Sequence, residues 1–177
     1  WRVVGLNPAG EKYFRSIASP VLTEDLVIAP YARGATLTAI RRGGAGDVTG
    51  SHVAWVRSDL GADVPTPAAA GSLVIVCTDK GRVEGMSAAT GKTLAAVDLD
   101  KNRNAFSASP VIVDGGVLVT REDGRSWLLA MPDRQKGPPP LSEIGGGTTG
   151  EMTVATPVCV DGIILVRTHD ALWCFGR

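Results

Sequence analysis

Few side chains in this 177-residue chain have the type and spacing that chemistry requires. The two histidines, His52 and His169, have no nucleophile, base or second metal ligand at a matched spacing. The cysteines Cys77, Cys159 and Cys174 are scattered, so they indicate neither a disulfide framework nor a C-x-x-C zinc site. We therefore predict no catalytic residue and no metal site, and we expect both histidines to lie at the surface.

Acidic and glycine-rich stretches offer two further kinds of site. A calcium loop concentrates several oxygen ligands within about a dozen residues. Four aspartates instead stand singly in expected hairpin turns, where Asp is a usual turn residue: Asp114, Asp123, Asp161 and Asp170. The stretch Gly43–Thr49 lacks the G-K-[ST] ending of a phosphate loop and joins two expected strands. It is interpreted as an ordinary long loop with a possible role in binding.

Candidate binding residues lie at strand ends and in the long loop over residues 42–51. Arg33, Arg121 and Arg167 occupy matching places near the ends of three expected strands. If they converge on one rim, their guanidinium groups could receive an acidic partner. Solvated strand ends are the alternative interpretation. Asp47 lies in the long loop and His52 follows it, so the candidate partner-binding set is completed by these two residues.

The element that must position these residues is a repeat. Its mark is a Ser or Thr followed by Pro, at Ser19-Pro20, Thr66-Pro67, Ser109-Pro110 and Thr156-Pro157. Successive prolines are 47, 43 and 47 positions apart, which matches the period of a four-stranded propeller blade. Turn-forming pairs recur four and five places after each proline, and again thirteen and fourteen places after it. The sequence therefore predicts an all-β chain of four propeller blades, each a four-stranded antiparallel sheet.

Each blade divides into strands A to D. Strand A follows the proline, where the missing backbone donor costs nothing. Strand B is apolar throughout, which indicates burial on both faces; it is expected at residues 26–31, 73–78, 116–121 and 163–168. Strand C is expected at residues 37–41, 83–87, 127–131 and 172–175, and strand D at 52–57, 93–99 and 141–144. Residues 145–153 are expected to connect the third blade to the fourth.

Each end of the chain holds an incomplete blade. Residues 1–6 resemble a strand D of a preceding blade, and the blades are expected at about 17–58, 64–99, 107–145 and 154–177, the last without a strand D. Two interpretations follow. The chain is the C-terminal half of a seven- or eight-bladed ring, or Trp1–Val4 pairs with Leu172–Phe175 and closes a four-bladed ring.

Charge and hydropathy argue against two kinds of partner. The chain has 18 basic and 18 acidic residues, so it offers no basic stripe to nucleic acid. No apolar run approaches the roughly 18 residues that span a bilayer, so we expect no membrane span. The sequence begins at Trp1 without an initiator Met or a leader, and we expect it to be a piece of a longer protein.

Several motifs resemble those of a known family. The turn Ala88-Ala89-Thr90-Gly91-Lys92 resembles the A-x-T-G-K turn of PQQ-like (quinoprotein-type) β-propeller repeats. The loop over residues 43–49, with His52 and Trp55 beyond it, and the ending over residues 167–176 are similar to bacterial proteins of that type. The resemblance covers essentially the whole chain and is nearest to the BamB-like group. It implies a larger ring, an extracytoplasmic location in the periplasm or cell envelope, and a role as an assembly scaffold.

Two departures from the family pattern qualify what the resemblance implies. The family usually carries a Trp shortly after the T-G-K turn, where Leu94 and Ala95 stand here. We therefore expect Trp1 and Trp55, with the Thr90-Gly91 turn, to dock the blades. Quinoprotein dehydrogenases hold PQQ with calcium beneath a disulfide between adjacent cysteines, and this chain has no Cys-Cys pair. The resemblance thus implies a PQQ and calcium site only if a missing part of the protein supplies it.

The function expected from these observations is a non-catalytic propeller scaffold that binds protein partners, with cell-envelope protein assembly as its implied setting. One alternative is a PQQ-dependent oxidoreductase whose cofactor residues lie in the missing half. A second alternative is a carbohydrate or small-ligand binder, since pockets favour the mouths and centres of closed β structures.

Overall fold

Four antiparallel β-sheets make up nearly all of the regular structure in this computed structural model, which describes residues 1–7, 10, 17–31, 36–132 and 139–176. The strands of each sheet follow one another in chain order. The first sheet contains β1 (Val21–Leu22), β2 (Leu26–Tyr31), β3 (Thr36–Arg41) and β4 (Val53–Arg57). The second contains β5 (Ala68–Ala70), β6 (Leu73–Cys77), β7 (Arg82–Ser87) and β8 (Thr93–Asp98), and the third contains β9 (Val111–Val113), β10 (Gly116–Thr120), β11 (Arg125–Ala130) and β12 (Glu143–Thr148). The fourth contains β13 (Val158–Val160), β14 (Ile163–Arg167) and β15 (Leu172–Phe175). These sheets are blades 1 to 4, and the predicted all-β propeller class is confirmed.

The structure differs from the sequence prediction at two places. Strand β12 runs through Gly145–Gly147 to Thr148, where a connection was expected, because β11 pairs with it from Arg125 to Leu129. Blade 3 therefore extends past residue 145. A short helix, α1 (Thr49–His52), replaces the first residue of the expected strand D, so β4 begins at Val53.

Strand B of blade 2, β6, shows why the strand B sequences are apolar at every position. Every residue of β6 is buried, and alternate side chains enter two different cores. Val74 and Val76 pack with Ile28 and Leu37 between blades 1 and 2. The other side chains of β6 pack against blade 3. Complete burial of each such side chain contributes about 1.5–3 kcal/mol, so this strand joins three blades.

The Ser/Thr-Pro motif has a hydrogen-bonding role that the repeat alone does not reveal. The backbone N–H of Ser19 donates to Oγ1 of Thr66 at 2.9 Å, that of Thr66 to Oγ of Ser109 at 3.0 Å, and that of Ser109 to Oγ1 of Thr156 at 3.0 Å. We call this series the hydroxyl ladder. It joins each blade to the next beside the inner strands, which explains why each repeat carries a hydroxyl before its proline.

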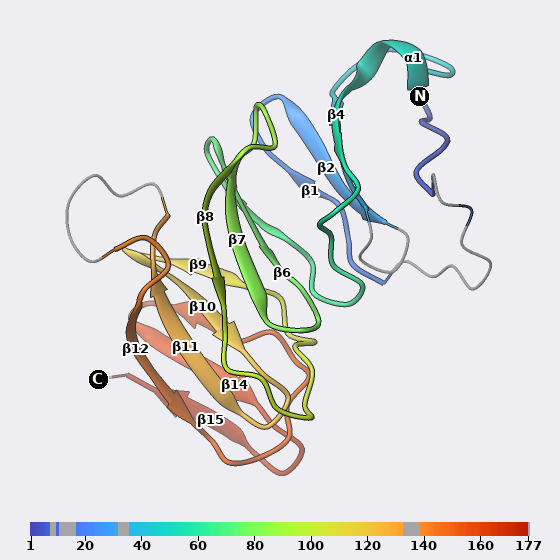
Figure 1. Cartoon of the computed structure of the whole chain (residues 1–177). Coiled ribbons are helices and arrows are strands. Elements are labelled where there is room, and N and C mark those ends of the chain that lie inside the picture. Colours follow the sequence, from blue (N-terminus) through green and yellow to red (C-terminus); the bar gives the residue numbers. More distant parts are fainter. Residues whose placement is uncertain (8–9, 11–16, 32–35, 133–138, 177) are drawn as a thin grey trace.

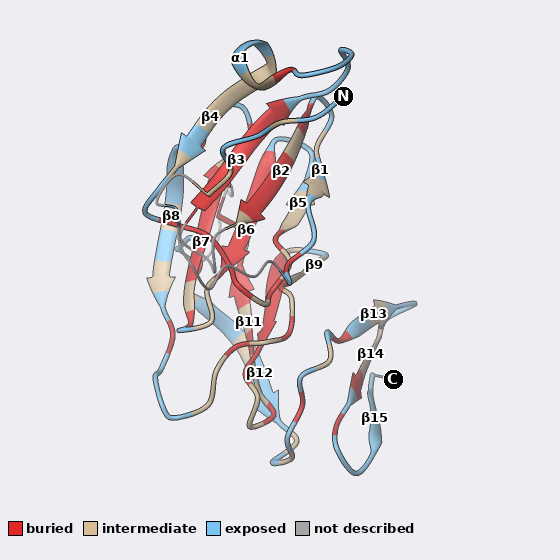
Figure 2. Cartoon of the chain, turned by 90° about the vertical axis from the view of Figure 1, so that its right-hand side faces the viewer, coloured by how far each residue is buried: buried red, intermediate tan, exposed pale blue. Residues whose placement is uncertain are grey.

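The blades form an open arc (Figure 1), with blade 1 at one end and blade 4 at the other. Trp1–Val4 does not pair with Leu172–Phe175. Arg2 instead forms an isolated bridge with Asp47 in blade 1, so the closed four-bladed alternative is not formed. Figure 2 shows that buried residues are concentrated in blades 1 to 3, whereas β13 and β15 are largely exposed. Among the described residues, no helix is long and apolar enough to cross a membrane.

Candidate functional site

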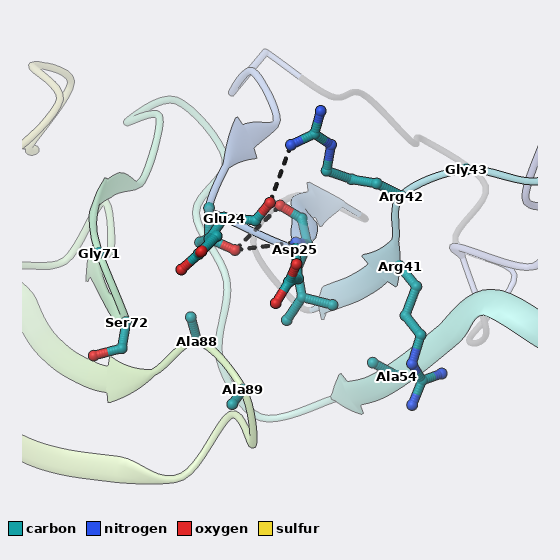
Figure 3. Close-up of a pocket in the computed structure, with 12 residues that line it drawn as sticks. Glu24, Asp25, Arg41, Arg42, Gly43, Ala54, Gly71, Ser72, Ala88 and Ala89 are labelled. Carbon is teal, nitrogen blue, oxygen red and sulfur yellow. Dashed lines mark hydrogen bonds between the residues drawn. The ribbon is translucent and has the colours of Figure 1, made fainter.

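An open cavity of about 810 Å³ lies between blades 1 and 2 (Figure 3). Its walls are formed by two turns from each of the two blades. One turn joins strands A and B, and the other follows strand C. Twelve residues line it: Thr23, Glu24, Asp25, Leu26, Arg41, Arg42, Gly43, Ala54, Gly71, Ser72, Ala88 and Ala89. We call this cavity the blade 1–2 groove.

Small side chains in blade 2 keep the groove open. The pairings Val76–Glu84 in blade 2 and Val119–Trp127 in blade 3 are equivalent, because both valines lie nine places after the blade's proline. Counting on from them, Ala88 and Ala89 correspond to Met131 and Pro132. Pro132 packs so closely on Gly85 of blade 2 that a Cβ there would lie 2.3 Å from its Cγ. The alanines leave vacant the volume that these larger side chains fill one blade further on.

Four charged side chains line one wall of the groove. Glu24 and Asp25 belong to the turn after β1, and Arg41 and Arg42 to the end of β3; all four are exposed. Nη1 of Arg42 donates to the carbonyl oxygen of Glu24 at 3.0 Å, which joins the two turns (Figure 3). Within the part of the chain that the structure describes, these carboxylates and guanidinium groups form no ion pairs with each other.

The predicted loop residues Asp47 and His52 lie beyond Gly43, outside the lining of the groove. Oδ1 of Asp47 accepts a hydrogen bond from the backbone N–H of Thr49 at 3.0 Å, and its carboxylate faces Nη2 of Arg2 at 3.5 Å. The hydrogen bonds from Thr49, with a smaller effect of Arg2, lower the pKa of Asp47. Nδ1 of His52 lies 2.8 Å from Oγ of Ser51. Both side chains thus form hydrogen bonds within the loop.

Of the three arginines considered for a shared rim, the structure describes Arg121 and Arg167. Arg121 is buried; its Nε and Nη2 donate to the two carboxylate oxygens of Asp123, each at 3.0 Å, and its Nη1 donates to the carbonyl of Asp100. This ion pair, followed by a hydrogen bond from Asn102, lowers the pKa of Asp123 to about 2. Arg167 is exposed at the end of β14, and Arg33 lies outside the described residues. The guanidinium of Arg121 therefore binds Asp123 of its own blade and the connection that follows β8 of blade 2.

The predicted docking residues lie as follows. Nε1 of Trp55 donates to the carbonyl of Ala88 at 2.9 Å, and its ring covers Gly91 so closely that a Cβ there would lie 2.9 Å from ring atoms. Gly91 has a φ of +67°, which favours glycine. Oγ1 of Thr90 accepts a hydrogen bond from the N–H of Lys92 at 3.3 Å. Trp55 thus joins blade 1 to the turn of blade 2, whereas Trp1 is 52% exposed.

The sequence analysis missed a second junction between the same blades. Glu84 on β7 is buried, and its carboxylate accepts hydrogen bonds from Nη1 of Arg57 at 2.9 Å and from Oγ1 of Thr93. Arg57 also donates to both carboxylate oxygens of Asp59, and these acidic partners, Asp59 first, raise the pKa of Arg57. In the sequence, the signal for this junction was the single acidic residue Glu84 in a largely apolar strand.

The groove itself was also missed, although its residues carried a signal. Glu24-Asp25 was interpreted only as a turn, yet the equivalent turns contain Gly71-Ser72, Asp114-Gly115 and Asp161-Gly162. Consecutive arginines likewise follow strand C in blade 1 alone. Departures from the repeat, more than the repeat itself, mark this site.

The described residues do not fit a PQQ–calcium site. Cys77 lies in the core between blades 2 and 3, while Cys159 and Cys174 lie on β13 and β15, which β14 separates. No group of three or more His, Cys, Asp or Glu side chains that could hold a metal ion is found in the part of the chain that the structure describes. This set of donors does not match the acidic and amide ligands or the vicinal disulfide of the quinoprotein dehydrogenases.

Four consecutive antiparallel blades, joined by an inner hydroxyl ladder and by the docked Thr90-Gly91 turn, define a β-propeller fold. Comparison with solved structures agrees. BamB from Moraxella catarrhalis is 19% identical with a TM-score of 0.67, and the alignment covers 90% of this chain and 47% of BamB. The computationally designed protein Ika4 is 17% identical with a TM-score of 0.68, covering 99% of this chain and 98% of Ika4.

A europium-containing methanol dehydrogenase is more distant, at 14% identity and a TM-score of 0.51, over 77% of this chain and 26% of the enzyme. The chain thus spans about half the length of BamB and nearly the whole length of Ika4. At these identities the likeness concerns the fold alone. No family model and no curated protein matches the sequence.

Proposed function

We propose that this chain is a non-catalytic propeller domain that binds a protein partner through the blade 1–2 groove. The observation that carries the proposal is an open cavity of about 810 Å³ whose wall presents two carboxylates and two guanidinium groups. A peptide segment with both acidic and basic side chains would complement this wall. Histidine and cysteine, which often serve as bases and nucleophiles, do not line the groove.

The setting that we propose is cell-envelope protein assembly, outside the cytoplasm. It is supported by the fold shared with BamB and by the resemblance of the sequence motifs to the BamB-like group. The chain corresponds to about half of BamB, so a longer protein would present this groove together with further blades.

The test is selection of peptides from a random phage-displayed library against the immobilised chain, followed by measurement of Kd for the selected peptides. The variant Ala89→Met places a side chain in the groove where blade 2 carries only a methyl group, and Lys92→Met adds the same side chain to the same turn outside the lining. We expect Ala89→Met to weaken binding at least about tenfold and Lys92→Met to leave it unchanged.

Charge neutralisation provides the second arm of the test. Replacing Arg41 and Arg42 by Gln, or Glu24 and Asp25 by Gln and Asn, should weaken binding and remove part of its dependence on salt, because exposed charges are screened by ions. Peptides that bind all variants equally well would contradict the proposal. So would stoichiometric release of a quinone from the native protein that contains this chain, which would favour the oxidoreductase.

A further inference from the structure

We propose that the turn between β9 and β10 is a site of spontaneous covalent modification, at which Asp114 rearranges to isoaspartate. The chain contains three Asp-Gly pairs: Asp114-Gly115, Asp123-Gly124 and Asp161-Gly162. The pairs have the same local chemistry, so the fold must account for any difference in their reactivity. The structure leaves the reacting groups of Asp114 free and holds those of Asp123, which makes Asp123 an internal control. We leave Asp161 out of this comparison because blade 4 lies at the end of the arc (Figure 1).

The rearrangement needs only the aspartate and the amide that follows it. The backbone nitrogen of Gly115 forms a bond to the side-chain carboxyl carbon of Asp114, and the carboxyl hydroxyl leaves as water with the amide proton. Water then opens the resulting cyclic imide. Opening at the main-chain carbonyl routes the chain through the side-chain carboxyl group and gives isoaspartate, whereas opening at the other carbonyl restores aspartate. The water released in the first step is consumed in the second, so no oxidant, reductant or cofactor is needed.

Both reacting groups are free at Asp114. The residue is exposed, and its carboxyl group forms no hydrogen bond or ion pair among the described residues. The backbone N–H of Gly115 likewise has no hydrogen-bond partner in the described part of the chain. Glycine also presents no Cβ that would crowd the attack on the carboxyl carbon.

The exposure of this turn does not depend on where the sequence begins or ends. Strand β9 contacts β5 of blade 2 on one side and β13 of blade 4 on the other, so both neighbouring blades are part of the chain. The turn also lies outside the lining of the blade 1–2 groove, so the inference is independent of the proposed function.

The carboxylate of Asp123, by contrast, is held on both oxygens. Nε and Nη2 of Arg121 donate to them at 3.0 Å each, and Nδ2 of Asn102 donates at 2.8 Å. These bonds, those from Arg121 first, lower the pKa of Asp123 to about 2. The group therefore stays ionised at mildly acidic pH, and an ionised carboxylate has no hydroxyl group to lose as water.

The amide of the second pair is held as well. The N–H of Gly124 donates to the carbonyl oxygen of Arg121 at 2.9 Å, and Gly124 is buried against Thr149 and Glu151. Formation of the imide at Asp123 would have to break this hydrogen bond and the ion pair together. Local opening of the turn must therefore precede the reaction at Asp123, and the fold suppresses it there.

Isoaspartate at Asp114 should loosen the inner edge of blade 3. It adds one carbon to the main chain of a two-residue turn, whose flanking residues Val113 and Gly116 pair with each other. We expect the amides of β9 to exchange with solvent faster in the isomerised chain than in the fresh one, while those of β6 stay unchanged. Equal exchange at β9 in the two preparations would contradict this consequence.

Peptide mapping after prolonged incubation of the folded chain at mildly acidic pH tests the proposal. Trypsin cleaves after Arg121 and so recovers the two pairs on separate peptides, and an isoaspartyl peptide has the same mass as its parent but elutes separately. In the folded chain we expect isoaspartate at Asp114 to exceed that at Asp123 at least about tenfold, and in guanidinium chloride we expect similar rates at both sites.

The variant Asp114→Glu is the matched control, because its longer side chain would have to close a larger ring. The isomeric peptide from this position should disappear in Asp114→Glu, and the rest of the peptide map should stay the same. A folded chain in which Asp114 forms no isoaspartate would overturn the proposal, and so would one in which Asp123 isomerises as fast as Asp114.

Discussion

Single charged residues in this protein mainly join structural elements. Arg121 is fixed by the carboxylate of Asp123 two residues further on, and Glu84 receives Arg57 from the neighbouring blade. Each pair satisfies hydrogen-bonding groups that would otherwise be buried without partners, which costs more than the pair itself stabilises. These residues consequently act on the stability of the blades.

The Arg121–Asp123 pair predicts a pH dependence of stability. The pKa of Asp123 is about 2 in the folded chain and near its ordinary 3.8 when unfolded. The pair therefore stabilises the fold fully above about pH 4 and loses its effect as the pH falls toward 2. Urea denaturation of Asp123→Asn should show a loss of about 1 kcal/mol at neutral pH, because partial exposure weakens the pair, and a smaller decline between pH 4 and pH 2.

The control for this pH effect is Asp114→Asn. Asp114 is exposed and forms no ion pair among the described residues, so its replacement should leave the pH profile of the wild type unchanged. An Asp123→Asn variant that declines between pH 4 and pH 2 as steeply as the wild type would contradict the assignment.

The thiol of Cys77 is predicted to be inert in the folded protein. Burial, followed by the nearby charge of Asp79, raises the pKa of Cys77 to about 12, so the reactive thiolate is scarce at pH 8. In dilute protein, iodoacetamide should modify the exposed Cys174 first and leave Cys77 unmodified until denaturant is added, as followed by peptide mass spectrometry. Equal labelling of both residues under native conditions would show that the core around β6 opens readily.

The turn of blade 2 is the element that sets the junction with blade 1. Replacing Gly91 by Ala would force a side chain into a left-handed backbone conformation and against the ring of Trp55. We expect a loss of about 1–3 kcal/mol in the free energy of unfolding, measured by urea denaturation. Gly147→Ala is the matched control, because a Cβ there meets nothing within 4 Å and the backbone has no positive φ. Equal effects of the two substitutions would argue against docking by Trp55.

The elements differ in how far the sequence specifies them. The Ser/Thr-Pro entries and paired turn residues identify the blades, because each inner strand and each hairpin needs those residue types locally. The sequence analysis did not predict the C-terminal part of the outer strand β12. Gly145–Gly147 has little strand propensity of its own and owes its extended conformation to pairing with β11. Arg121, one of the arginines considered for a rim, is buried beside Asp123, and the position of Asp123 two residues further on was a signal for this local pair.

The groove and the exposure of Cys174 depend on relations between blades. The cavity exists because Ala88 and Ala89 meet the turn of a different blade, a relation that no local pattern encodes. Cys77 is buried between blades 2 and 3, whereas Cys174 is exposed because no described blade covers that face of blade 4. Local sequence patterns thus predict the strands and turns of each blade. The packing of one blade against the next determines where the groove lies and which side chains are exposed.

At the scale of the whole molecule, stability is distributed unevenly along the arc. Two buried cores join blades 1, 2 and 3, and within the described residues no comparable core joins blade 4. An apolar cavity of about 600 Å³ lies there instead, lined by residues that include Leu118, Leu128, Ile164, Val166 and Phe175. Repeat proteins gain stability from each interface between neighbours, so blade 4 should be the least stable unit.

Hydrogen exchange measures that difference directly. In dilute protein, the amides of β13 to β15 should exchange faster than those of β6 and β10, because opening blade 4 uncovers little additional apolar surface. Strand β6, whose residues are all buried, serves as the internal reference for a well-protected strand. Equal exchange across the four blades would mean that blade 4 is as firmly packed as its neighbours.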